Sequence, residues 1–200
     1  MRALALALAL ALLLAAAQAG KAFDVDQVSV QEMIGFLDHG DWHFRLDACD
    51  ALADRRIREA EPTIARLATE DPHERVRGRC LGALKEMGAK GLVPTAETAA
   101  RADSHEDVRT LGLGILEEKA TDTSAPVVAE VLLRDPEPGL RRKAAIILGK
   151  RGWSAGGEAL AEAALGDPDD GVRKEALESL IKVGRAEQGA LLHRIMLEDR

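Results

Sequence analysis

The chain has 200 residues, of which 46% are hydrophobic and 30% charged, and its net charge is −7. It contains no Tyr, three Phe and two Trp, a composition that does not suit a thick aromatic core and favours thin contacts between small-residue helices. Charges of both signs are interspersed, which is typical of a solvated folded surface and not of a disordered chain. The acidic balance argues against nucleic-acid binding.

The first element in chain order is an apolar segment at the N-terminus. Arg2 is followed by an apolar run from Ala3 to Ala17, and Ala17-Gln18-Ala19 provides an A-x-A cleavage motif before Gly20, as in a secretory signal peptide. A helix of this run would reach about 22 Å at 1.5 Å per residue, short of the ~30 Å hydrocarbon core of a bilayer. We therefore predict a signal peptide over residues 1–19, a mature start at Gly20, a periplasmic or secreted location and no membrane span after cleavage.

The rest of the chain carries an internal repeat with a constant period of 32 residues. Each copy contains an arginine preceded by an apolar residue, with a small residue three positions later and Leu seven positions later, which traces one face of a helix, here called helix B. The equally spaced arginines are Arg45, Arg77, Arg109, Arg141 and Arg173. Upstream, Pro62, Pro94 and Pro126 recur with the same period. In most copies apolar residues follow that slot at i, i+3 and i+4 spacing, which predicts a second amphipathic helix, helix A.

The turn between helix A and helix B contains a recurring aspartate, six residues before the arginine. The series is Asp71, Asp103, Asp135 and Asp167, and three of the four are followed by Pro. Asp as N-cap with Pro at the first helical position is favourable, so we predict that helix B begins at this Asp, with a nearby acid completing a capping box. Gly88, Gly152 and Gly184 are placed to end helix B.

The phrase D-P-x-x-x-V-R-x-x-A-x-x-A-L resembles the short HEAT-like repeats of the phycobilin-lyase type, from residue 30 to about residue 199. The resemblance implies an all-α, right-handed α-solenoid of about five and a half helical hairpins, with residues 20–29 as lead-in and residues 30–200 as the repeat domain. It also implies a structural ladder between neighbouring repeats. The ladder residues are Asp71, Arg77, Asp103, Arg109, Asp135, Arg141, Asp167 and Arg173.

The two ends of the array depart from the repeat. In repeat 1, Ser29 and Glu32 form a predicted capping box for helix A, and His39 stands in the aspartate slot. Repeat 6 consists of helix A alone, with Asp199 in the aspartate slot. That last helix carries bulky apolar residues such as Leu191 and Leu197. Two alternatives stay open: the helix closes the core, or its outer face docks a second copy or another protein.

Four histidines fall at the A–B turns of the first three repeats: His39, His43, His73 and His105. A metal site at this edge is conceivable, but equivalent positions in adjacent repeats lie about 10 Å apart, which favours solvated histidines at helix starts. We predict no metal and no cofactor. No common catalytic motif is present, and so few aromatic residues suit a bilin pocket poorly. A bilin-lyase-like enzyme or a metal protein remains the alternative to a non-catalytic protein.

The two cysteines, Cys49 and Cys80, fall on the helices B of repeats 1 and 2. Export permits a disulfide. Helix axes about 8–10 Å apart strain the ~5.5–6 Å Cα separation that a disulfide prefers. This comparison favours two buried thiols, and the disulfide stays an open alternative.

The exposed face of helix B should carry positions +1, +2, +5 and +9 after each arginine. From repeat 1 to repeat 4 this face changes from acidic, through small and apolar, to basic. Solenoids bind partners along such concave surfaces. We therefore predict a non-catalytic scaffold that binds another protein or peptide on this face. We predict no binding of nucleic acid. The predicted partner-binding residues are Arg79, Leu111, Arg142, Lys143, Ile146 and Lys150.

Overall fold

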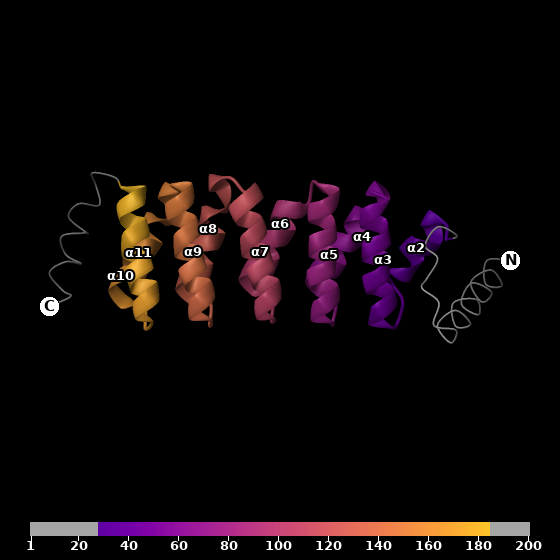
Figure 1. The fold of residues 1–200 in the computed structure, drawn as a ribbon, viewed down its shortest axis with the longest axis horizontal. Coiled ribbons are helices and arrows are strands. Elements are labelled where there is room, and N and C mark those ends of the chain that lie inside the picture. Colours follow the sequence, from indigo (N-terminus) through magenta and orange to yellow (C-terminus); the bar gives the residue numbers. More distant parts are fainter. Residues whose placement is uncertain (1–27, 185–200) are drawn as a thin grey trace.

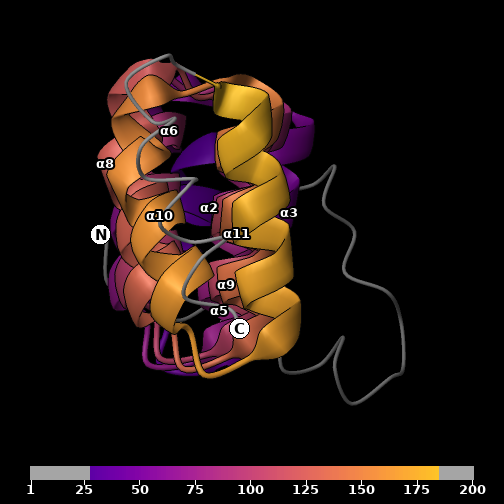
Figure 2. The same ribbon diagram turned by 90° about the vertical axis from the view of Figure 1, so that its left-hand side faces the viewer.

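The structure, a computed structural model, describes residues 28–184, which contain ten α-helices, three short 3-10 helices and no strands. The helices form two parallel rows (Figures 1 and 2). The helix-A row consists of α2 (Val30–Phe36), α4 (Glu61–Glu70), α6 (Leu92–Ala102), α8 (Ala125–Arg134) and α10 (Gly157–Gly166). The helix-B row consists of α3 (Trp42–Asp54), α5 (Glu74–Met87), α7 (Glu106–Lys119), α9 (Pro138–Arg151) and α11 (Asp170–Val183). The predicted all-helical solenoid is confirmed.

The short 3-10 helices Arg58–Ala60, Asp122–Ser124 and Ser154–Gly156 precede α4, α8 and α10 in the B–A connections. Pro62 and Pro126 lie in the first turn of α4 and α8, as expected. Gly88 and Gly152 end α5 and α9 with φ of 63° and 64°, a left-handed conformation that only Gly adopts at little cost. The periodic proline and glycine signals therefore mark helix boundaries correctly.

The prediction for the start of helix B was wrong by two residues. Asp71 is the C-cap of α4, and the N-cap of α5 is His73, whose imidazole accepts from the backbone N–H of Arg75. The same shift holds in the next three turns, where Asp103, Asp135 and Asp167 end helix A. The Asp side chain instead accepts the backbone N–H two residues later, at 2.9 Å in the case of His73, which is an Asx-type turn.

Because helix B begins two residues later than predicted, the nearby acidic residues occupy other helix positions than expected. Glu74, Glu106 and Asp170 are the first residues of their helices, so they lie near the positive end of the helix dipole but do not close a capping box. The predicted capping box of repeat 1 is present, because Ser29 and Glu32 bond each other's backbone N–H groups at the start of α2.

A line of leucines forms the spine of the core between the two rows. The Leu seven residues after each ladder arginine is 0% exposed in all five repeats, and the small residue three positions after the arginine is buried as well. These leucines are Leu52, Leu84, Leu116, Leu148 and Leu180. Helix A contributes buried apolar residues such as Ile64, Val128 and Leu160. The predicted repeat frame therefore positions the core correctly.

Helices α6 and α7 approach each other closely at Gly112 of α7. A Cβ at this position would lie 2.7 Å from the backbone nitrogen of Ala100 and 2.8 Å from the carbonyl oxygen of Ala96, both in α6. Other repeats carry Ala or Cys at the equivalent position, so α6 and α7 have moved into the space that the missing methyl group leaves.

We expect Gly112→Ala to lower the free energy of unfolding by about 1–3 kcal/mol, because backbone atoms of α6 must move to admit the methyl group. Gly114→Ala on the same helix is the control. There the new Cβ would meet only the Lys143 ammonium at 3.6 Å, and the better helix propensity of Ala should raise stability by up to about 1 kcal/mol. Urea denaturation followed by circular dichroism compares the two, and equal midpoints would contradict the expectation.

Three predictions fall outside the described residues. They are the signal peptide over residues 1–19, most of the lead-in before Val28, and the final helix A with Leu191 and Leu197. Within residues 28–184, none of the helices has both the length and the apolar character needed to cross a membrane.

Candidate functional site: the ladder and the helix-B face

Ion pairs between consecutive repeats run along the A–B turns. Four of the five equally spaced arginines donate from Nε and Nη2 to both carboxylate oxygens of the aspartate 26 residues later, at 2.6–2.7 Å and 2.8–3.2 Å. Arg45, which the predicted ladder did not include, is one of the four, whereas Arg173 bonds only backbone carbonyls among residues 28–184. The pairs are Arg45–Asp71, Arg77–Asp103, Arg109–Asp135 and Arg141–Asp167. In each case Nη1 also donates to a backbone carbonyl of its own turn, so every arginine joins its own turn to the next one.

The ladder side chains are almost completely buried, with 8–10% of the arginine side chain and 1–5% of the aspartate side chain exposed. Hydrogen bonds to the aspartates raise the pKa of the four arginines. Burial alone would raise the pKa of Asp71, but the hydrogen bonds from Arg45 and from the backbone of His73 outweigh it, and the pKa lies below its ordinary value. This carboxylate therefore stabilises the fold above its unfolded-state pKa, and the contribution is lost as pH falls through the folded-state pKa.

The helix-B face presents the six residues predicted to bind a partner. Arg79 lies on α5, Leu111 on α7, and Arg142, Lys143, Ile146 and Lys150 on α9. All six are at least partly exposed, and Ile146 at 37% is one of the few large hydrophobic residues of the described chain that solvent reaches to this extent. The structure thus brings the six residues onto three successive helices of one row (Figure 1).

Most cations of this face already pair with carboxylates, and each of these cations has at least one such partner in a neighbouring repeat. Arg142 contacts Glu175 at 3.5 Å, and Lys150 contacts Glu117 at 2.6 Å. Arg79 pairs with Asp50 and Glu86. These acids were not predicted as partners. A signal for them exists in the sequence, because Lys150 and Glu117 are separated by 33 residues, one more than the period of the repeat. Arg142 and Glu175 have the same separation.

Lys143 differs from the other cations of the face. Its ammonium donates to the carbonyl oxygen of Thr110 at 3.2 Å and has no carboxylate partner within residues 28–184. It lies over Gly114, whose absent side chain leaves room for it. Leu111, next to Thr110 on α7, and Ile146, three residues after Lys143 on α9, are the apolar residues of this face on the same two helices. The centre of the helix-B face therefore combines exposed apolar carbon with an ammonium whose hydrogen bonds are incompletely used.

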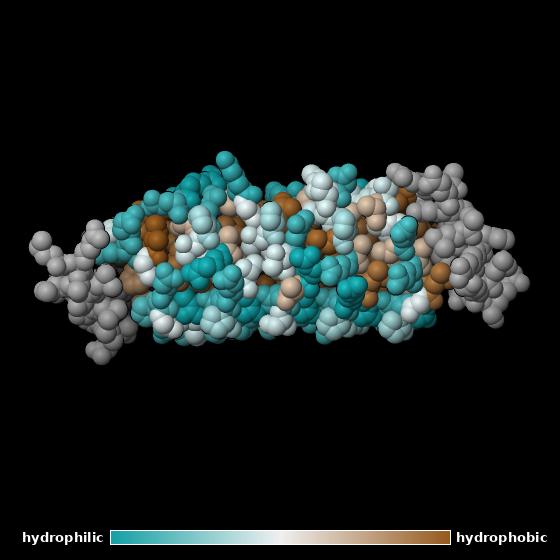
Figure 3. All heavy atoms as spheres, turned by 180° about the vertical axis from the view of Figure 1, so that it is seen from behind, coloured by the Kyte–Doolittle hydropathy of each residue, from teal (hydrophilic) through white to brown (hydrophobic). Residues whose placement is uncertain are grey.

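The opposite face of the array, formed by the helix-A row, has a different character. Figure 3 shows its hydrophobic residues as separate patches among hydrophilic ones. Leu133 of α8 is the exposed large hydrophobic residue here, at 36%. Cross-repeat pairs occur on this face too, between Arg66 and Asp38 at 2.9 Å and between Arg101 and Glu130 at 3.7 Å.

The histidine edge, formed by the A–B turns that carry His39, His43, His73 and His105, contains a stack of three rings. Trp42 lies between His43 and His73, with ring centroids 3.7 and 4.0 Å apart. His73 and His105 are helix N-caps, at helix starts as predicted, but the His73 side chain is only 28% exposed because it stacks on Trp42. In the described part of the chain, the His, Cys, Asp and Glu side chains form no group of three or more that could hold a metal ion.

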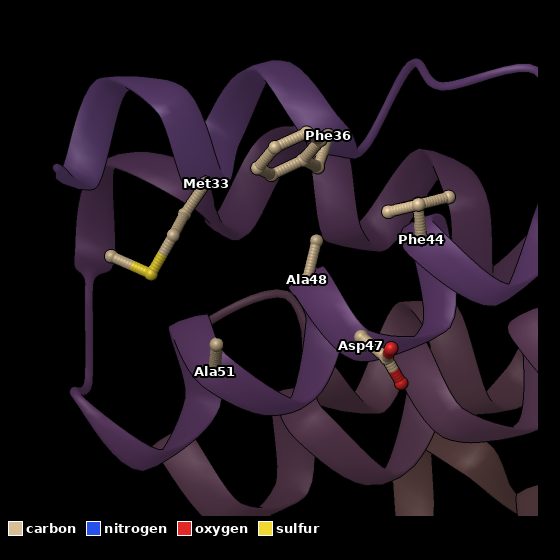
Figure 4. A pocket seen from close by; sticks show the side chains of 6 residues that line it. All are labelled: Met33, Phe36, Phe44, Asp47, Ala48 and Ala51. Atoms are coloured by element: carbon tan, nitrogen blue, oxygen red, sulfur yellow. The ribbon is translucent and has the colours of Figure 1, made fainter. Parts of the chain in front are cut away.

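A small hollow lies beside this edge, between α2 and α3 (Figure 4). Met33, Phe36, Phe44, Ala48 and Ala51 line it together with Asp47, and the rings of Phe36 and Phe44 stack with centroids 5.9 Å apart. Burial raises the pKa of Asp47, and the nearby His43 offsets only part of that rise.

The expectation of two buried thiols was wrong, because Cys49 and Cys80 form a disulfide with a Cα–Cα distance of 5.5 Å. The prediction used an average distance between helix axes. Here the Cα atoms of Cys49 on α3 and Cys80 on α5 are 5.5 Å apart, so the two backbones approach more closely at this point than an average axis distance implies. The disulfide joins repeats 1 and 2 covalently.

We expect reduction of this disulfide to destabilise the protein by about 3–4 kcal/mol, the loop-closure value for a loop of roughly 30 residues. Chemical denaturation with and without dithiothreitol measures the difference. The variant with both Cys49→Ala and Cys80→Ala should show no response to the reductant. Two titratable thiols in protein unfolded without reductant would contradict the disulfide.

Comparison with known proteins places this geometry in a family. The model of HEAT repeats matches residues 30–117 and 125–200. The chain belongs to the HEAT-repeat family. Among solved structures, it is similar to the complex of CpcE and CpcF of phycocyanin lyase from Nostoc sp. PCC7120, with a TM-score of 0.53 and 18% identity over 86% of this chain and 70% of that one. At this identity the likeness shows the fold alone. A search of curated proteins finds no match.

Proposed function

We propose that this HEAT-repeat protein is an exported, non-catalytic scaffold that binds another protein through its helix-B face. HEAT repeats suggest a protein-interaction scaffold, since solenoids present long surfaces to partners. The observation that carries the proposal is the arrangement at the centre of the face, where Lys143 of α9 bonds the carbonyl oxygen of Thr110 on α7 and has no carboxylate partner in residues 28–184. The partly exposed Leu111 follows Thr110 on α7, and the exposed Ile146 lies one turn further along α9. A partner that supplies a carboxylate and an apolar side chain would complete both kinds of contact.

The test uses two residues of matched exposure on opposite faces. Ile146 on α9 and Leu133 on α8 are 37% and 36% exposed, so replacing either with Asp should perturb folding to a similar, small degree. Partners are captured from extracts of the source cell envelope with the wild type, Ile146→Asp and Leu133→Asp. We expect Ile146→Asp to lose the partner and Leu133→Asp to keep it. Loss in both variants, or in neither, would refute binding on the helix-B face.

A second pair of variants tests the charge. Lys143→Glu should weaken binding to the same partner, whereas Lys90→Glu, in the exposed turn after α5, should not. The effect should be largest at low ionic strength, where exposed charges are least screened. If Lys143→Glu does not change the binding, the partner does not supply a carboxylate to Lys143.

The proposal of export is supported by the Cys49–Cys80 disulfide, because disulfides persist in oxidising compartments and are rare in the cytosol. The apolar N-terminal run with its A-x-A motif supports it independently. N-terminal sequencing of protein isolated from its source should find Gly20 as the first residue. Mature protein that begins at Met1 would exclude a cleaved signal.

A further inference from the structure

The ladder is incomplete at Arg173, the last of the five arginines. Its Nη1 donates to the carbonyl oxygens of Asp167 and Pro168 at 2.9 and 3.3 Å, just as Arg141 bonds Asp135 and Pro136. The guanidinium is therefore held in the ladder position. Nε and Nη2, which in the four earlier arginines hold an aspartate, have no carboxylate partner within residues 28–184.

The neighbouring surface is also uncovered at this end of the array. Leu177 of α11 is partly exposed, although the equivalent residues of the four earlier repeats are all buried. Ala164 of α10 is likewise partly exposed, whereas its equivalents Ala68, Ala100 and Leu132 are 0% exposed. In the earlier repeats the next helical hairpin covers these positions. Both helix rows thus end on apolar side chains that pack on the core but are only partly covered by the described residues.

The sequence contains a segment that fits this surface. Each of the four complete pairs joins an arginine to the aspartate 26 residues later, and the residue at the same separation after Arg173 is Asp199. Leu192, Ile195 and Met196 stand one full period after Leu160, Ala163 and Ala164 of α10, which are the positions that face the core or the next repeat. The HEAT-repeat match also extends to residue 200.

We propose that residues 185–200 of the same chain cover the end of the array, and that Asp199 binds the guanidinium of Arg173 as a fifth ladder pair. The apolar residues at 192, 195 and 196 pack on Ala164 and Leu177. Because the guanidinium fork takes both oxygens of a carboxylate, the pair fixes the register of the terminal segment against α11.

The test is hydrogen exchange by mass spectrometry on the full chain. In the wild type, backbone amides of residues 186–198 should be protected. Asp199→Asn, which keeps the size of the side chain and removes its charge, should reduce this protection roughly ten- to a hundredfold, the value of hydrogen bonds to a charged group. Glu198→Gln is the matched control, one residue away in the same segment, and should leave the protection unchanged.

Arg173→Ala supplies the second half of a double-mutant cycle. We expect it to reduce the protection as Asp199→Asn does, and the double variant to lose no more than Arg173→Ala alone. Equal effects of Asp199→Asn and Glu198→Gln, or additive losses in the cycle, would overturn the ion pair. Unprotected residues 186–198 in the wild type would overturn the cover itself. Protection that rises with protein concentration would assign the surface to a second copy and overturn the intrachain contact.

Discussion

Replacing Arg109 with Ala should lower the free energy of unfolding by about 3–5 kcal/mol, because the change leaves the carboxylate of Asp135 buried without its partner. Asp135 is 7% exposed and receives two hydrogen bonds from Arg109. Urea denaturation followed by circular dichroism measures the loss. Arg134→Ala is the control, since that side chain is 79% exposed and its contact with Glu130 is 4.0 Å long, and it should cost less than about 1 kcal/mol.

The double variant with Arg109→Ala and Asp135→Ala separates the two parts of this effect. Removing both charges removes the desolvation penalty together with the attraction, so the double variant should be more stable than Arg109→Ala alone. If Arg109→Ala costs no more than Arg134→Ala, the ladder does not stabilise the array.

Leu116→Ala should cost about 2–5 kcal/mol, as a truncation in a closed core does. Leu116 is 0% exposed at the middle of the leucine spine. Repeats pack on both sides of it, so the core cannot close the cavity that the truncation leaves. Leu111→Ala on the same helix is the control, because Leu111 is only partly buried on the helix-B face and should cost markedly less. The two denaturation midpoints are compared at equal protein concentration, and an unchanged midpoint for Leu116→Ala would show that this leucine is not part of the core.

The architecture could be predicted because the repeat has no insertions. A constant period, repeated without slip, identifies equivalent positions, so that Leu116 could be placed in the core together with Leu84 and Leu148. The register of the turn could not be predicted in the same way. Asp-Pro is common both at helix starts and in turns, and the choice depends on where the buried arginine of the preceding repeat holds the carboxylate, as Arg45 holds Asp71.

The contacts of the helix-B face were harder to predict than its location. Position relative to the arginines places Lys143 and Lys150 on that face, but their partners depend on the lateral offset between neighbouring helices, which sets the separation of 33 residues. The disulfide depends on the local distance between α3 and α5, and an average packing distance does not resolve the difference. The sequence pattern therefore predicts on which face of a helix a residue lies. Its contact partners depend on the distance and offset between adjacent repeats.

The Cys49–Cys80 bond has a mechanical consequence. A repeat array stretched from its two ends lengthens by releasing hairpins, because each repeat contacts only its neighbours. The disulfide removes the chain between residues 49 and 80 from that extension, with a sequence separation of 31 residues, or about 100 Å of contour length at ~3.3–3.6 Å per residue. In a single-molecule pulling experiment the oxidised protein should reach a final length shorter by about that amount than the reduced protein. The loop between residues 49 and 80 thus keeps its length under load, whereas the chain outside it can unfold and extend.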